Sequence, residues 1–146
     1  MKQVNIYTQS SIKALKPQNG AIGYRLETET SKGPHTLYEI LKIQNATAHQ
    51  SELKALIEAL KRMRQPCQLT IFTESGYVAA GYDSGWVEKW MQSGWMTSRK
   101  TEVANRKEWE ELHSLISRHR FTFKVAQEHK HREWLRSEVE KKAKEN

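Results

Sequence analysis

The chain has 146 residues, 37% of them hydrophobic, which is enough for one globular domain over residues 1–146. No stretch approaches the run of about 20 apolar residues that a membrane helix needs, and the single Cys67 excludes an internal disulfide. The formal net charge of +7 favours a polyanionic partner. Because the first ten residues lack the apolar core of a signal peptide, a cytoplasmic location is expected.

Apolar patterning predicts five strands, at residues 3–8, 21–28, 36–43, 68–73 and 121–126. The polar stretch TETSKGPH between the second and third strands contains Gly33 and Pro34 and is typical of a hairpin connection. The first three strands should therefore form a meander.

Apolar residues recur at helical spacing between residues 53 and 63. Thr47 and Gln50 resemble a capping box, so this helix should begin near Ala48, and Pro66 ends it. Further helices are expected at 76–81, 85–92, 102–118 and 131–145. A meander followed by alternating helices and strands predicts an α/β fold, with a mixed five-stranded sheet and helices packed on it.

Two predicted strands end in nearly the same short sequence, IYTQSS at residues 6–11 and IFTESG at residues 71–76. If the first and fourth strands are parallel neighbours, Gln9 and Glu74 emerge together at their carboxyl ends, where open α/β sheets bind ligands. Glu52 is expected in the first turn of the long helix, where its carboxylate can lean over the same end of the sheet. An acid in that position also stabilises the helix dipole without any further function.

Five stretches carry a family resemblance, namely VNIYTQSS, TAHQSELKALIEAL, LTIFTESGYV, WVEKWMQSGWMTSRKTEVANRKEWEEL and FKVAQEH. Their order and nearly full coverage of the chain resemble ribonuclease H of the bacterial type-one class. The resemblance implies a ribonuclease H-like fold. It also implies hydrolysis of the RNA strand of RNA–DNA hybrids, with four carboxylates holding two Mg²⁺ ions about 4 Å apart.

The catalytic residues of that family transfer unevenly to this chain. Glu52 occupies the position of the family's Glu, and Glu74 replaces an Asp. Gln9 replaces the first Asp, which bridges both metal ions. His129 lies where the family keeps a His that helps product or metal release.

The fourth acid is expected in the last helix, where counting without gaps from His129 reaches Val139. The family places small apolar residues one before and three after this acid. Val139 and Ala143 flank Glu140 in this way, so Glu140 is the first choice, and Glu138 remains the alternative.

The loss of the first acid predicts a degenerate active site. A Gln carbonyl can bind Mg²⁺, but it brings no charge and cannot bridge two ions as a carboxylate does. Glu52, Glu74 and Glu140 would remain as metal ligands, so weak binding of Mg²⁺ or Mn²⁺, as a single ion, is expected. Hydrolysis should accordingly be weak or lost.

Nucleic-acid contacts are better preserved. The resemblance places Asn105 and Arg106 where the family grips a phosphate of the DNA strand. It places Thr47 and His49 in a triplet that reaches the minor groove of the hybrid, and because the second and third residues of this triplet differ from the family's Asn-Asn, selectivity for the hybrid should be reduced. For Lys89, Arg99 and Lys100, contact with phosphate and plain solvation both remain open. Trp86, Trp90 and Trp95 match the aromatic framework of the family's basic handle, and these rings are expected to pack rather than stack on bases. The expected partner is an RNA–DNA hybrid or another duplex. The protein is expected to be a monomer and not to associate with a membrane.

Three functions remain open on the sequence alone. The chain is a nucleic-acid-binding protein whose ancestral reaction is weak or lost, or an active divergent ribonuclease H with an altered metal site. A non-catalytic interaction module, with a partner on the charged last helix, is the third.

Overall fold

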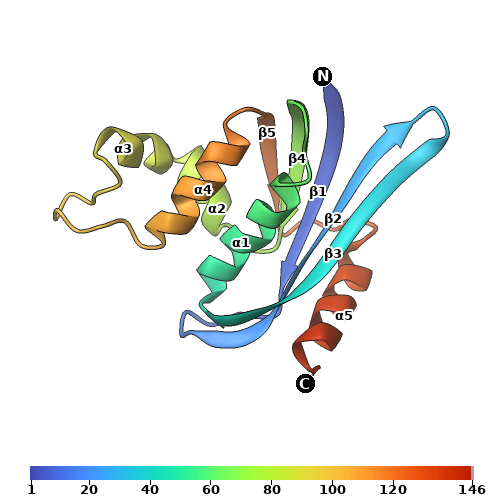
Figure 1. Cartoon of the computed structure of the whole chain (residues 1–146), viewed down its shortest axis with the longest axis horizontal. Helices are drawn as coiled ribbons and strands as arrows, with labels where there is room; N and C mark the ends of the chain where they lie inside the picture. The colour runs from blue at the N-terminus through green and yellow to red at the C-terminus, as the bar shows by residue number, and fades with distance from the viewer. Residues whose placement is uncertain (146) are drawn as a thin grey trace.

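The computed structural model describes residues 1–145, which form five strands and five helices (Figure 1). The strands are β1 (Lys2–Ser10), β2 (Gln18–Thr30), β3 (Gly33–Ala46), β4 (Cys67–Thr73) and β5 (Arg120–Val125). The helices are α1 (Ala48–Leu60), α2 (Tyr77–Asp83), α3 (Trp86–Gln92), α4 (Arg106–Ile116) and α5 (Arg132–Ala143). Every predicted strand and helix is present, in the predicted order.

All five strands form one mixed sheet in the order β3-β2-β1-β4-β5. β1 pairs with β2, and β2 with β3, in antiparallel register, whereas β1 with β4 and β4 with β5 are parallel. The predicted α/β fold with a mixed sheet is confirmed. The predicted parallel pairing of the first and fourth strands is confirmed as well.

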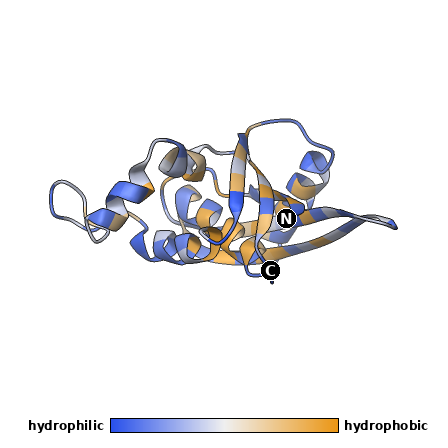
Figure 2. Cartoon of the chain, turned by 90° about the horizontal axis from the view of Figure 1, so that it is seen from above, coloured by the Kyte–Doolittle hydropathy of each residue, from blue (hydrophilic) through white to orange (hydrophobic). Residues whose placement is uncertain are grey.

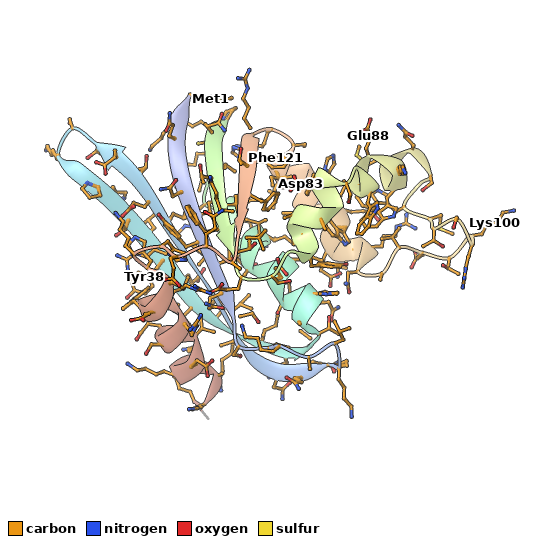
Figure 3. The ribbon with its side chains drawn as sticks, turned by 180° about the vertical axis from the view of Figure 1, so that it is seen from behind. Met1, Tyr38, Asp83, Glu88, Lys100 and Phe121 are labelled. Carbon is orange, nitrogen blue, oxygen red and sulfur yellow. The ribbon has the colours of Figure 1, made fainter. Side chains whose placement is uncertain are left out.

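Helices cover both faces of this sheet. Successive strand residues point to opposite faces, so Ile6 belongs to the core beneath α1 and α4, whereas Tyr7 packs with Leu135 and Val139 of α5. Figures 1 and 3, drawn from opposite sides, show α1 in front of the sheet in one view and α5 in the other. Hydrophobic residues concentrate where strands and helices meet (Figure 2).

α3 and the following loop project from one side of the molecule (Figure 1). The loop spans residues 93–105 and includes a short bridge between Met96 and Glu102. α4 therefore begins at Arg106, later than the sequence pattern predicts. No helix within residues 1–145 is long and apolar enough to span a membrane.

Candidate active site

The carboxyl ends of β1 and β4 lie side by side, as the similar sequences at residues 6–11 and 71–76 predict. Tyr7 and Phe72 stack on the face that carries α5, and Gln9 and Glu74 follow them two residues later on the same face. The Gln9 Nε2 donates a hydrogen bond to Glu74 Oε1 over 3.3 Å. Both residues line a pocket of about 180 Å³ at this end of the sheet.

Glu52 reaches the same pocket from α1. The backbone N–H of Gln50 donates a hydrogen bond to the Thr47 hydroxyl over 3.1 Å. The backbone N–H of Thr47 donates one to Gln50 Oε1 over 3.1 Å. This capping box starts the helix at Ala48, so Glu52 lies just beyond the first turn, which contains no acid. The structure thus brings Gln9, Glu52 and Glu74 around one cavity.

The Glu52 carboxylate is an unusual group for a protein interior. The residue is 7% exposed, and within the described chain neither of its oxygens receives a well-formed hydrogen bond, although the Ser75 hydroxyl and the Val78 amide lie close enough to lower its pKa. Burial raises the pKa of Glu52 to about 7, despite the opposing effect of the nearby Ser75 hydroxyl. A buried carboxylate that lacks well-formed hydrogen bonds is costly, which is typical of a group retained for a site.

Two arginines of α5 bind Glu74. Arg132 donates from Nε to Oε1 over 2.7 Å and from Nη2 to Oε2 over 3.0 Å, and Arg136 Nη2 lies 3.4 Å from Oε1. Partial burial raises the pKa of Glu74, but the hydrogen bonds from the arginines and Gln9 outweigh it. The pKa of Glu74 therefore lies below its ordinary value. Both oxygens of this predicted metal ligand are engaged by guanidinium groups.

The packing of α5 explains why arginines face Glu74. Leu135 and Val139 are buried against the sheet beside Gly23, which pairs in register with Gln9. A Cβ at Gly23 would lie 2.7 Å from Val139 Cγ2, so the glycine allows the close approach of the helix. The two buried apolar residues stand one before and three after Arg136, which is the spacing expected around the fourth acid.

The structure does not bring either candidate for the fourth acid to the pocket. Glu140 is exposed, and Glu138 pairs with Lys141 over 3.3 Å. His129 lies near the site but outside the pocket, with its ring 4.4 Å from that of Tyr7. Burial lowers the pKa of His129.

The residues present do not fit a site for two metal ions. Within residues 1–145 no three His, Cys, Asp or Glu side chains are grouped closely enough to hold one. Gln9 is neutral, and Glu74 is already neutralised by arginine. Among residues 1–145, the pocket carboxylate that stays available to a cation is that of Glu52, whose oxygens make no well-formed hydrogen bond.

Several predicted nucleic-acid residues belong to a packed polar network beside the pocket. The His49 ring stacks on Tyr77 at 3.8 Å, and the Tyr77 hydroxyl accepts from Asn105 Nδ2 over 3.2 Å and from Trp109 Nε1 over 2.9 Å. Thr47 serves as the helix cap described above. Asn105 and His49 are therefore held in place by one tyrosine.

The predicted basic residues separate into two groups. Lys89, Arg99 and Lys100 are exposed on α3 and the projecting loop, and Figure 3 shows Lys100 at its tip. Arg106 is instead paired with Glu102 over 3.0 Å and with Glu110 over 2.6 Å. The first group offers free positive charge to a ligand, whereas Arg106 is occupied.

The tryptophans of this region differ in exposure. Trp90 and Trp95 pack against the main core, and Trp90 lies edge-on to Trp109 at 5.4 Å. Trp86 is 47% exposed, so it is the one ring of the three that is open to a ligand.

Sequence reasoning missed Arg132, Arg136, Lys13 and Tyr77. The two arginines are four residues apart and so share one helical face, which is a signal that the sequence does contain. Lys13 lines the pocket from the loop after β1, where an exposed lysine has no distinguishing pattern.

Comparison with known proteins decides the family of this site. The family model for RNase H matches residues 1–143. The chain belongs to the ribonuclease H family. A ribonuclease H from Acetivibrio thermocellus is 33% identical over 134 residues, which cover 92% of this chain and 88% of the relative. One from Caldicellulosiruptor saccharolyticus is 34% identical over 131 residues, which cover 88% and 86%.

Solved structures show the same ribonuclease H fold. LC9-RNase H1, a type 1 RNase H with the type 2 active-site motif, has a TM-score of 0.73 at 19% identity. That match covers 89% of this chain and 65% of the other. A foamy viral protease-reverse transcriptase in complex with an RNA/DNA hybrid has a TM-score of 0.66 at 14% identity, over 97% of this chain and 19% of that chain. Identities this low show the fold alone.

Proposed function

We propose that this member of the ribonuclease H family binds nucleic acid and hydrolyses the RNA strand of RNA–DNA hybrids weakly or not at all. One observation carries the proposal. At the corner where the family needs carboxylates, Gln9 is neutral and Glu74 is bound by Arg132 and Arg136. The protein is then a nucleic-acid-binding protein with a degenerate active site.

Charge supplies the physical reason. Two divalent ions beside a phosphate need several negative charges, but Arg132 neutralises Glu74, and Lys13 is the cation that acts on Glu52. A cation approaching Glu74 would have to displace a bidentate guanidinium, which is among the stronger ion-pair geometries in proteins. We therefore expect at most one Mg²⁺ or Mn²⁺ ion, held weakly at Glu52.

Binding of a duplex is supported by exposed charge. Lys89, Arg99 and Lys100 lie free on the projecting side, and the net charge is +7. The foamy viral relatives were solved with an RNA/DNA hybrid and with double-stranded DNA. Affinity should fall with salt by roughly 0.9 log units per log unit for each phosphate neutralised. A cytoplasmic location and a monomeric state stay predictions.

An active, divergent ribonuclease H with an altered metal site is the second candidate. Glu52 favours it, because this buried carboxylate lines the pocket, makes no well-formed hydrogen bond and suits a cation. In this alternative one ion at Glu52 would suffice for slow cleavage.

Cleavage of a labelled RNA–DNA hybrid in Mg²⁺ and in Mn²⁺ separates these candidates. The Glu52→Gln variant tests whether any activity belongs to the site. Glu58→Gln, on the same helix with its carboxylate paired to Lys61, is the matched control. The proposal expects binding of the hybrid with cleavage near background. Robust cleavage that Glu52→Gln abolishes and Glu58→Gln preserves would establish the alternative.

A further inference from the structure

Two cations from separate elements contact polar residues that line the pocket at Glu52. Lys13 comes from the loop after β1, and its Nζ lies 3.5 Å from Gln9 Oε1. Arg136 comes from α5 and lies outside the pocket lining, with its Nη2 3.4 Å from Oε1 of Glu74, which does line the pocket. Since Gln9 and Glu74 are hydrogen-bonded to each other over 3.3 Å, the two cations flank one short polar bridge.

The two arginines are not equally available to a ligand. The Arg132 side chain is 20% exposed, and it is held by both oxygens of Glu74 and also by Glu128. The Arg136 side chain is 52% exposed and has only the one long contact with Glu74. A guanidinium carries five N–H donors, so most donors of Arg136 remain unused.

Lys13 is similarly free. It is exposed and lines the pocket, its ammonium contacts the neutral Gln9 amide, and its positive charge lowers the pKa of Glu52 without forming an ion pair within residues 1–145. Glu74 is neutralised by Arg132, and Glu52 is buried at the back of the pocket. A site expected to be acidic therefore also has two cationic side chains, Lys13 and Arg136, with donors available to an anion.

We propose that this end of the sheet binds a phosphate of a nucleic-acid backbone directly, without a metal ion, through Lys13, which lines the pocket, and Arg136, which lies beside Glu74. Arg132 is a positioning residue, because its bidentate bond fixes Glu74 and with it the neighbouring Arg136. Guanidinium and ammonium groups here supply the charge that divalent ions would otherwise bring to a phosphate. This inference rests on the proposed nucleic-acid binding.

Affinity for a labelled RNA–DNA hybrid, measured by fluorescence anisotropy in EDTA and in Mg²⁺ over a salt series, tests the proposal. The natural protein should bind in EDTA at least as tightly as in Mg²⁺, because Mg²⁺ competes with Lys13 and Arg136 for the phosphates. Lys13→Ala and Arg136→Ala should each weaken binding about fivefold and lower the salt slope by about one unit.

The matched controls are Lys32→Ala, in the turn between β2 and β3, and Arg120→Ala, at the start of β5. Both are exposed and remove the same charge away from the pocket. Variants at Lys13 and Arg136 that bind no worse than these controls would overturn the inference. Binding that is lost in EDTA would overturn it as well, while leaving the proposed nucleic-acid function in place.

Two further outcomes concern the ligand. Absence of hybrid binding in both buffers would refute the proposed function together with this inference. Competition by millimolar inorganic phosphate, dependent on Lys13 and Arg136 but without hybrid binding, would assign the pocket to a free phosphate and overturn the backbone assignment.

Discussion

Arg132 binds both carboxylate oxygens of Glu74, at 2.7 Å and 3.0 Å, and so joins α5 to the end of β4. An ion pair of this kind needs no metal to hold the two elements together. It also explains why a strand end that resembles a metal ligand in sequence is already satisfied in the folded chain.

The buried Glu52 predicts a pH-dependent difference between the natural protein and Glu52→Gln. The pKa is raised to about 7 in the folded state, so the folded chain binds the proton more tightly than the unfolded chain. The stabilising contribution is therefore complete below about pH 4.5 and is lost as the pH rises through about 7. Relative to the natural protein, Glu52→Gln should gain up to about 3 kcal/mol between pH 4.5 and pH 8.

Urea unfolding in EDTA across this pH range measures the difference. Glu58→Gln should show no such trend, because its carboxylate pairs with Lys61 near the surface. A stability difference between Glu52→Gln and the natural protein that stays constant with pH would argue against a buried, proton-binding Glu52.

Gly23 predicts a steric test of the contact between α5 and the sheet. A Cβ at this position would lie 2.7 Å from Val139 Cγ2 and 2.8 Å from Ile40 Cδ1, so Gly23→Ala should cost about 1–3 kcal/mol. At Gly76 the nearest atom to a new Cβ is 3.7 Å away, and Gly76→Ala should cost less than about 1 kcal/mol. Equal losses for the two variants in denaturant unfolding would rule out the close approach.

The two groups of basic residues predict unequal effects on duplex binding. Arg99→Ala combined with Lys100→Ala should lower the salt slope by about two units, because both charges are free. Arg106→Ala should change it less, because Glu102 and Glu110 already bind that guanidinium. The idea fails if Arg106→Ala alone weakens binding as much as the double variant.

Much of the fold follows from local patterns, and the differences have local causes. The hairpin between β2 and β3 is tighter than predicted, because pairing continues to Thr30 and Gly33 through residues that lie outside the core. Polar composition there concealed the strands. α4 begins only at Arg106, because Asn105 before it has a left-handed backbone with a φ of 62°, which a right-handed helix cannot include.

The site was only partly predictable for a different reason. Gln9 and Glu74 meet because their strands are parallel neighbours, and the similar sequences at residues 6–11 and 71–76 predict this pairing. Which face of α5 meets Glu74 depends instead on how Leu135 and Val139 pack beside Gly23. This is tertiary packing, and counting residues from His129 without gaps cannot predict it.

Arg132 and Arg136 occupy Glu74, a position where the family binds metal ions. Restoring the acidic residues of this site tests that claim most directly. The measurement is the rate of hybrid cleavage in Mg²⁺ for two variants. One carries Gln9→Asp and Glu74→Asp, and the other adds Arg132→Gln and Arg136→Asp. The account predicts that the first stays near background, because the arginines still neutralise the corner. The second should cleave at least about 100-fold faster, because four carboxylates then surround the pocket. Equal rates for the two variants, whether both are active or both inactive, would contradict the account.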